Sequence, residues 1–337
     1  MRTFAIGFAC LTLLMGCVPG DQDTGTSPST ILSPLNKDRT QGGPIVVFDG
    51  NPAECYAPDW SPANNFIAFA YYEPWAPRGS VARLPYVREE LARLAHANYS
   101  DRISISPDGR RIAYTVGDSI FIVAATGGEP HFVVAPGCEP AWSPDGLSLV
   151  FTDNSNESGP SGLKTVSIDD GAVSDVTDGT YNDRYPCWTS QGKIIFHSNR
   201  PLPARPPGQG LWSVGRDGAE PPVAIAFSFS PPEDGIPILR KPDVCPQEAA
   251  LVFELSWIRG PYIEGPEIAF LPTEGGTVVF PEKRVLGAYP AWDHEGGRII
   301  FVGDYGHRYR CLLLLELDER LLYSDSDRKA PSASSSL

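Results

Sequence analysis

One short pattern recurs along the chain: a tryptophan, a turn rich in Ser, Pro, Asp and Gly, and then an apolar run. The clearest copy is EPAWSPDGLSLVF at 139–151. Pro144 fixes φ for the second position of a type I turn, Asp145 suits the third, and Gly146 can adopt the positive φ that reverses the chain. The pattern therefore predicts two strands joined by a tight turn, with Trp142 at the end of the first strand.

Five further copies of this pattern are found. They are DWSPANNFIAF at 59–69, SISPDGRRIAY at 104–114, CWTSQGKIIF at 187–196, a degraded CPQEAALVF at 245–253 and AWDHEGGRIIF at 291–301. The positions equivalent to the tryptophan are Trp60, Ile105, Trp142, Trp188, Cys245 and Trp292. A unit of strands and turns that recurs about every 40–50 residues is typical of a β-propeller blade. Since a blade buries its faces only by stacking on its neighbours, we expect the tryptophans in the core between blades.

Composition agrees with an all-β fold. The chain has 33 Gly and 34 Pro among 337 residues, too many for a helical protein and suited to a protein dense in turns. Six blades account for residues 43–319 as a single domain. The one stretch with a helical pattern is PYVREELARLAHAN at 85–98, where a blade's third and fourth strands are expected and a short helix is the alternative.

Two overlapping segments, DVTDGTYNDRYPCW at 175–188 and YPCWTSQGKIIFHSNR at 185–200, resemble the repeat of TolB-type propellers. The resemblance implies an all-β, six-bladed β-propeller over most of the chain. It implies less about function, because propellers of this kind serve as binding proteins, lyases and peptidase caps. TolB itself resembles a propeller behind an N-terminal α/β domain, for which this chain has no room, so a role in the Tol system does not follow.

The last blade lacks one strand, because the chain becomes polar after residue 317. Residues 44–48 (PIVVF), just before the first blade, have the alternation of a strand. We therefore predict that 44–48 pairs with 311–317 and closes the ring, which removes two open sheet edges.

The N-terminus predicts export. Residues 1–16 have the pattern of a signal peptide. Leu-Met-Gly-Cys at 14–17 resembles the bacterial lipoprotein signal, and the resemblance implies acylation of Cys17. An ordinary secretory signal or an uncleaved anchor is the alternative. Residues 17–42 are expected to be a flexible tether, and 320–337 a disordered tail. Val18 favours the outer membrane, so the predicted location is the cell envelope, facing the periplasm or the cell surface.

Charge and cysteine content narrow the function further. The formal net charge is −14, which argues against nucleic acid as a partner and against a polybasic membrane surface. Beyond Cys17 the chain has Cys55, Cys138, Cys187, Cys245 and Cys311, which we expect to be buried thiols. If one disulfide forms, Cys187–Cys245 is the favoured pair.

No catalytic motif is predicted to be functional. Gly-Asp-Ser-Ile at 117–120 resembles the nucleophile block of GDSL esterases, but it lies between two strands where a hairpin turn is expected. Residues 153–159 have oxygen ligands without the turn glycine of a calcium loop. The five histidines show no zinc spacing. We therefore expect no catalytic residue, metal or cofactor, and a binding protein rather than an enzyme; the alternative is a lyase-like enzyme that acts on polysaccharide in the pore.

Strand direction indicates where a partner would bind. In an antiparallel blade, the connections between second and third strands and those between blades emerge on one face, and they are long in this chain. The predicted binding residues are Trp75, Arg78, Asp101, Arg102, Asp183, Arg184, Arg240, Asp243, Trp257, Tyr262, Tyr305 and Arg308. The alternative is that their charged members neutralise one another around a wet channel. The predicted protein is a monomer that binds a protein or a cell-envelope glycan and contacts the membrane only through its lipid.

Overall fold

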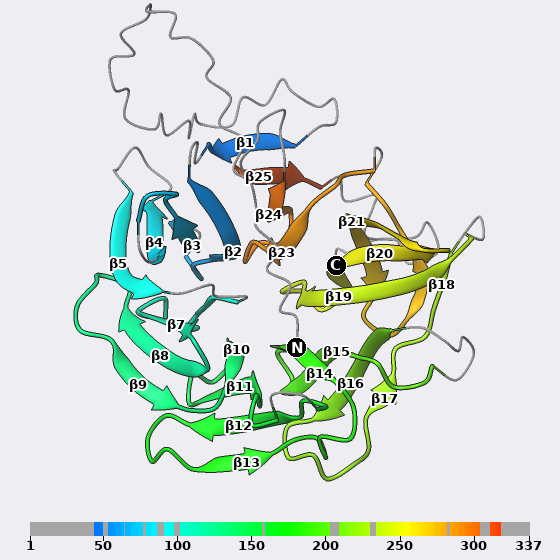
Figure 1. The fold of residues 1–337 in the computed structure, drawn as a ribbon, viewed down its shortest axis with the longest axis horizontal. Helices are drawn as coiled ribbons and strands as arrows, with labels where there is room; N and C mark the ends of the chain where they lie inside the picture. The colour runs from blue at the N-terminus through cyan, green and yellow to red at the C-terminus, as the bar shows by residue number, and fades with distance from the viewer. Residues whose placement is uncertain are drawn as a thin grey trace, which may run out of the picture.

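The protein is all-β and forms a six-bladed propeller whose blades are arranged in a ring (Figure 1). The computed structural model describes residues 44–317 except 50–52, 64, 77–78, 86–90, 98–101, 157–158, 203–208, 230–233, 282–283 and 304–310. These residues contain no helix, so none long and apolar enough to cross a membrane is found among them. The six blades expected from the repeats are confirmed, whereas the calls for 1–42 and 320–337 lie outside the described residues.

Blades 1 to 4 are antiparallel sheets whose four strands follow one another in sequence. Blade 1 consists of β2 (Glu54–Trp60), β3 (Phe66–Tyr72), β4 (Gly79–Pro85) and β5 (Ala92–Ala97). Blade 2 consists of β6 (Ser104–Ile105), β7 (Arg111–Val116), β8 (Ser119–Ala124) and β9 (His131–Val134). Blade 3 consists of β10 (Cys138–Trp142), β11 (Ser148–Thr152), β12 (Leu163–Ser167) and β13 (Val173–Asp175). Blade 4 consists of β14 (Asp183–Trp188), β15 (Lys193–Ser198), β16 (Gly210–Gly215) and β17 (Val223–Ala224).

Two details of these blades decide between alternatives left open by the sequence. The segment that could have been a short helix contains strand β5. Gly117 and Asp118 form the turn between β7 and β8, with Gly117 at a φ of 66°, which confirms the hairpin interpretation of the Gly-Asp-Ser-Ile motif.

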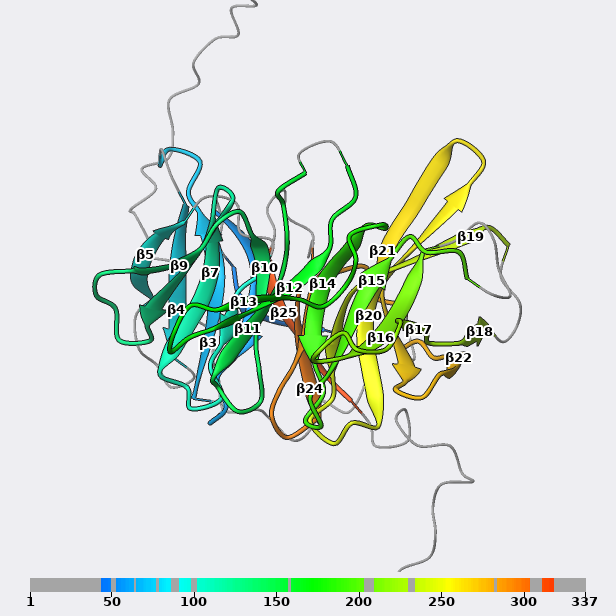
Figure 2. The same ribbon diagram turned by 90° about the horizontal axis from the view of Figure 1, so that it is seen from below.

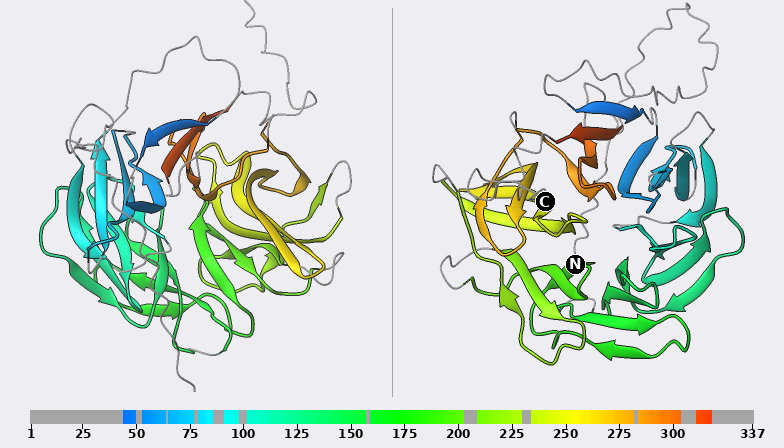
Figure 3. Two further views of the ribbon diagram at one scale, coloured as in Figure 1. Left: turned by 45° about the horizontal axis from the view of Figure 1, so that its top comes forward. Right: turned by 180° about the vertical axis from the view of Figure 1, so that it is seen from behind.

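Blade 6 is closed by the strand from the N-terminal side of the propeller. It contains β23 (Ala288–Trp292), β24 (Arg298–Gly303), β25 (Cys311–Glu316) and, as its outermost strand, β1 (Ile45–Phe48). Strand β1 runs antiparallel to β25, with Ile45 opposite Leu314 and Phe48 opposite Leu312. Figure 3 shows β1 beside the strands from the other end of the chain. The predicted ring closure is therefore confirmed.

Blade 5 departs from the common pattern. It has three regular strands, β19 (Ile236–Val244), β20 (Ala250–Arg259) and β21 (Tyr262–Pro272). In place of a regular fourth strand, β22 (Gly276–Val278) pairs in parallel with β18 (Phe227–Phe229). Strands β20 and β21 continue through 257–266, where the sequence predicted a long loop, and their last pair is Arg259 with Tyr262. The result is a long hairpin that projects from the propeller (Figure 2).

Five of the six innermost strands, all except β6, share a bulge three residues before the tryptophan position. The bulged residues are Ala57, Glu139, Tyr185, Lys241 and Tyr289, with φ between 48° and 56°. A left-handed residue at a bulge bends the strand and redirects the side chains that follow it.

This bulge corrects the alignment of blade 5. Lys241 is three residues before Val244, so Val244 and not Cys245 is equivalent to the tryptophan. Cys245 N donates to Ala250 O at 2.9 Å, as Ser143 N donates to Ser148 O at 2.9 Å in blade 3. Cys245 therefore takes the place of the turn serine.

The core lies between the blades. Trp60, Trp142, Trp188 and Trp292 are each 1–9% exposed and are packed with residues of the preceding blade, as predicted. Burying an aromatic side chain of this size contributes on the order of 4–6 kcal/mol. The five cysteines of the described residues are buried and free. A Cys187–Cys245 disulfide is therefore not present, since the two residues have different positions in their blades, one before the tryptophan position and one after it.

The propeller has two different faces, which we call the turn face and the loop face. The turn face carries the short turns of the repeated motif, such as 143–146, in which Gly146 has a φ of 69°. The loop face carries the β11–β12 connection (153–162), the tip of the β20–β21 hairpin and the joints between blades. Strand β1 ends on the loop face, because it is antiparallel to β25, so the chain enters it from the turn face.

Candidate functional site

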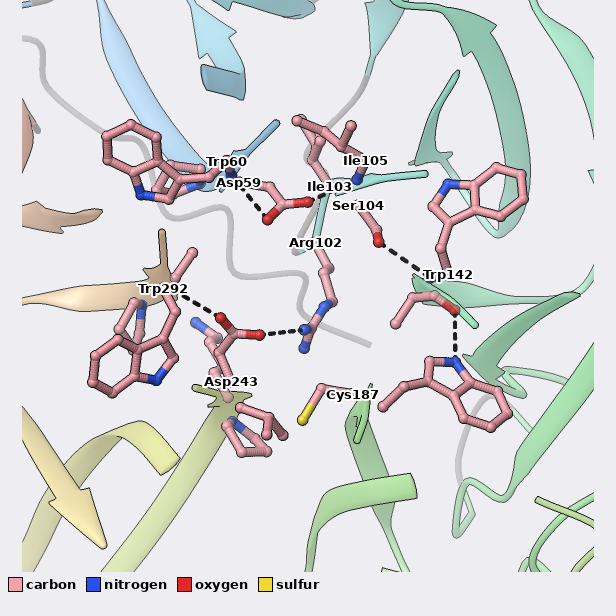
Figure 4. Close-up of a pocket in the computed structure, with 18 of the residues that line it drawn as sticks. Asp59, Trp60, Arg102, Ile103, Ser104, Ile105, Trp142, Cys187, Asp243 and Trp292 are labelled. Carbon is pink, nitrogen blue, oxygen red and sulfur yellow. Dashed lines mark hydrogen bonds and ion pairs between the residues drawn. The ribbon is translucent and has the colours of Figure 1, made fainter. Parts of the chain in front are cut away.

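Cavities lie near the centre of the ring toward each face, and we call this central space the channel. The cavity toward the turn face has a volume of about 370 Å³ and is lined by residues from all six innermost strands (Figure 4). The position just before each tryptophan equivalent lines this cavity, and in five of the six blades it follows the bulge. These positions are Asp59, Ser104, Ala141, Cys187, Asp243 and Ala291.

Three of these side chains link one blade to the next through backbone hydrogen bonds. Each accepts from the N–H at the tryptophan position of the following blade. The pairs are Ile105 N to Asp59 Oδ2 at 2.7 Å, Trp142 N to Ser104 Oγ at 3.1 Å and Trp292 N to Asp243 Oδ2 at 2.9 Å. The carboxylates of the channel therefore hold the blades together, which is a structural role.

Arg102 extends across the channel from blade 2 toward the opposite blade, blade 5. Its Nη2 lies 3.6 Å from Asp243 Oδ1, and Figure 4 shows the side chain spanning the space between the two strands. Burial raises the pKa of Asp243. Burial, and then the neighbouring charge of Asp243, raise the pKa of Asp59 to about 7. Arg102 therefore forms an ion pair with Asp243, and its charge opposes, without cancelling, the rise in the pKa of Asp59.

A larger cavity of about 900 Å³ opens on the loop face, among blades 2 to 5. Its lining is polar and rich in amide side chains. It is formed by Asp118, Ala135, Pro136, Asn154, Ser155, Asn156, Gly159, Ser161, Asn182, Arg184, Tyr185, His197, Asn199, Gln209 and Arg240. Tyr185 borders both cavities, so it forms part of the wall between them. We call this larger cavity the loop-face cavity.

Arg184 is positioned in the loop-face cavity by Glu139 of the preceding blade. Glu139 is fully buried and accepts from Arg184 Nη2 at 2.6 Å, Tyr185 N at 2.8 Å and Thr152 Oγ1 at 2.7 Å. Arg184 Nε is buried and has no acceptor among the described residues. The guanidinium is therefore fixed on one side and leaves a donor without a protein partner.

His197 lies at the base of the same cavity. Its Nδ1 is 2.6 Å from Leu239 O, so Nδ1 carries the proton and donates to that carbonyl. Burial, together with the charges of Arg240 and Arg184, lowers the pKa of His197 to about 4. His197 is therefore neutral at physiological pH, and the positive charge of the cavity comes from its arginines.

Lys241 lines the cavity toward the turn face. Its Nζ lies 3.0 Å from Glu254 Oε1 and 3.3 Å from the centre of the Tyr289 ring. Glu254 also accepts from Tyr289 N at 2.7 Å, which repeats in blades 5 and 6 the contact of Glu139 with Tyr185. The same glutamate-to-bulge bond thus occurs twice around the ring.

The predicted binding residues have different positions in the structure. Arg184 and Arg240 line the loop-face cavity, whereas Arg102 and Asp243 pair across the channel. Trp75 and Tyr262 are 67% and 70% exposed. The remaining calls in loops, Arg78, Asp101, Tyr305 and Arg308, lie outside the described residues.

Two predicted binding residues are interior and must be reassigned. Asp183 is fully buried, where Arg200 and Ser198 bond to its Oδ1, and burial raises its pKa. Trp257 is 2% exposed, because it lies on strand β20 and its ring is 4.7 Å from that of Phe229. Both side chains are parts of the core of the blades, not of a contact surface.

The sequence did not single out the amide side chains of the loop-face cavity. Asn154 and Asn156 belong to the segment 153–159, which the sequence analysis considered only as a calcium loop, and Asn199 belongs to the repeat motif itself. Asn182, Asn199 and Gln209 meet only because β14, β15 and β16 are neighbours in blade 4. Among the described residues, no group of three or more His, Cys, Asp or Glu side chains is placed to hold a metal ion.

Comparison with solved structures identifies the fold. The chain is similar to a TolB protein from Agrobacterium tumefaciens, with a TM-score of 0.58 and 18% identity over 79% of this chain and 91% of that one. The fold is that of a TolB-type propeller.

Other solved propellers of this type are similar at comparable levels. TolB from Acinetobacter baumannii matches with a TM-score of 0.50 and 15% identity, over 70% of this chain and 56% of that one. An oligogalacturonate lyase in complex with manganese matches with a TM-score of 0.56 and 13% identity, over 85% and 96%. No family model matches the chain, and no curated protein matches its sequence. At these identities the matches establish a TolB-type propeller and leave its ligand open.

Proposed function

We propose that the protein is a lipid-anchored binding protein of the cell envelope, which captures a protein or glycan partner with its loop face. The signal-like residues 1–16 and Cys17 support export and anchoring. Fold similarity to TolB proteins supports the same general location. In this proposal the tether of 17–42 carries the propeller on the membrane surface, and no chemistry is performed on the partner.

The observation that carries the proposal is the difference between the two ends of the channel. The loop face has an open polar cavity of about 900 Å³, whereas the cavity toward the turn face has about 370 Å³ and contains the Arg102–Asp243 ion pair. Recognition is usually built from variable loops on a rigid scaffold. Here the scaffold is held by buried bonds between blades, and the loops of several blades converge on one opening.

The direction of β1 adds a second reason. Because the chain enters β1 from the turn face, this proposal assigns the attachment of the tether to that side. The turn face would then look toward the membrane and the loop face away from it. The exposed aromatic side chains Trp75 and Tyr262 would be free to meet a partner.

Site-specific photo-crosslinking in cells tests this orientation. A photoreactive residue replaces Tyr262 on the loop face or Asp108 on the turn face, two exposed positions on opposite sides. We expect a crosslinked partner from Tyr262 and none from Asp108. Crosslinking from Asp108 alone would show that the working face is the turn face.

The rival proposal is a lyase-like enzyme, because an oligogalacturonate lyase shares the fold. It is tested by incubating the purified protein with envelope and plant polysaccharides, with and without added Mn²⁺ or Ca²⁺, and measuring new reducing ends and unsaturated products. Binding without any such product is expected. Product formed in proportion to the protein would replace the binding proposal with an enzymatic one.

A further inference from the structure

The loop-face cavity has a lining chemistry that points to a class of ligand. Five of its side chains are amides, contributed by the β11–β12 connection and by blade 4: Asn154, Asn156, Asn182, Asn199 and Gln209. An amide offers donors and an acceptor in fixed geometry, which suits the neighbouring hydroxyl groups of a sugar. Each of these amides stands within a polar opening, so a ligand that fills it must be rich in hydrogen-bonding groups.

The apolar part of the lining is small. Ala135 and Pro136 are its only aliphatic side chains among the described residues. Peptide recognition usually depends on apolar pockets for alternate side chains or on an open strand edge. The lining of this cavity provides few apolar contacts, and β14, β15 and β16 are paired with one another. A carbohydrate fits these surfaces better than a peptide does.

The cavity also carries positive charge on an acidic protein. Arg240 is exposed on β19 and makes no ion pair with a described residue. Arg184 is held by Glu139 and has an unpartnered Nε. The charges of both guanidinium groups lower the pKa of His197, so its imidazole stays neutral. An arginine bonds a carboxylate with two parallel, charge-assisted N–H···O bonds, which are stronger than the bonds it makes to neutral hydroxyl groups.

Size is consistent with an oligosaccharide. Pockets for small molecules span roughly 300–1,000 Å³. The loop-face cavity, at about 900 Å³, is at the upper end of that range and is open to solvent on the loop face. It can hold more than one sugar unit, with the rest of the chain extending outward.

We propose that the loop-face cavity binds an acidic glycan, with Arg240 contacting a sugar carboxylate and the amide side chains contacting hydroxyl groups. This inference rests on the proposed function, because it names the class of partner for the same face. Arg184, which Glu139 positions, adds a second positive charge to the wall of the cavity. His197 contributes neutral hydrogen bonding at the base.

Titration calorimetry on the full-length protein in detergent tests the inference with three probes. They are a mixture of uronic-acid oligosaccharides, the same oligosaccharides with each carboxyl group reduced to an alcohol, and an oligo-glutamate peptide of similar length. We expect the uronic-acid oligosaccharides to bind, the reduced ones to bind at least tenfold more weakly, and the peptide to show no binding of comparable strength.

Variants identify the residues responsible. Arg240→Gln should weaken binding of the acidic oligosaccharides at least tenfold and leave the reduced ones unchanged. Arg110→Gln is the matched control, since Arg110 is exposed and lines neither cavity. Asn154→Ala should weaken both sugar probes, and unchanged melting temperatures would show that each variant is folded.

The outcomes separate this inference from the proposed function. Equal binding of acidic and reduced sugars, or an Arg240→Gln variant with wild-type affinity, would overturn the acidic-glycan assignment. Binding of the peptide alone would overturn it too. If no sugar binds while Tyr262 still crosslinks a partner, this inference is wrong and the loop-face proposal stands. If neither face crosslinks a partner, the proposed function itself fails.

Discussion

The closure of the ring by β1 can be tested with one buried side chain. Phe48 is 1% exposed and packs between the first and last blades, with its ring 5.5 Å from Phe69 and 6.0 Å from Tyr71. Replacing a buried phenylalanine with alanine typically costs about 3–5 kcal/mol. For a domain of this size, each kcal/mol lowers the melting temperature by about 2–4 °C. Phe48→Ala should therefore lower it by roughly 6–20 °C.

A matched control exists on the corresponding strand of blade 2. Phe132 lies on the outermost strand β9, as Phe48 lies on β1, but it is 52% exposed and contacts mainly Phe121 at 5.8 Å between ring centres. The same substitution at Phe132 should cost about 1 kcal/mol or less, because little apolar surface leaves the core. The difference between the two variants isolates the contribution of the closure.

Thermal unfolding followed by circular dichroism, with urea unfolding at 25 °C, measures both variants. Deleting 44–48 should destabilise the protein at least as much as Phe48→Ala, since it also exposes the edge of β25. Equal and small shifts for Phe48→Ala and Phe132→Ala would refute the closure as a source of stability. An unchanged melting temperature after the deletion would refute it more directly.

Three further outcomes are expected. Cys17→Ser should release the protein from membranes into the soluble fraction, and mass spectrometry should find no acyl groups on it; a mature N-terminus elsewhere would contradict this. The pKa of Asp59 is raised to about 7 by burial, so its unfolded form loses a proton at lower pH than its folded form, and stability should fall as pH rises from about 4 to 7. We expect the free energy of unfolding in urea of Asp59→Asn, relative to that of wild type, to rise by about 1–2 kcal/mol from pH 5 to pH 7, a figure discounted for the exposure of the cavity to water. A difference between variant and wild type that does not change with pH would refute the raised pKa. Arg200→Leu should destabilise by about 3–5 kcal/mol, because it leaves Asp183 buried without its partner, and Asp183→Leu in the same chain should recover part of the loss in urea unfolding.

Much of the architecture follows from local sequence. The turn at 143–146 is specified by its own residues, since Pro144 sets one φ and Gly146 adopts a positive one. Repetition of that turn predicted the number of blades. The alternation in 44–48 predicted the closing strand, because an unpaired last blade needs a fourth strand of that pattern.

The position of individual side chains was decided by the tertiary structure. Trp257 looked like a loop residue, but β20 continues through it and Phe229, from a strand outside the repeat, covers it. Only the left-handed conformation of Lys241 shows that Val244, and not Cys245, occupies the tryptophan position in blade 5. These features depend on contacts with residues that are distant in sequence, which the local pattern does not encode.

The channel shows the same division. The sequence indicated its charged residues as candidate binding residues, but it did not indicate which residues they pair with. Arg102 pairs with Asp243 from the opposite blade, and Arg184 with Glu139 from the preceding one. The sequence determined that a ring of blades would form, because turns and alternation act over a few residues. Only the closed ring decided which charges meet and which remain open to a ligand, because those distances are set by the packing of all six blades.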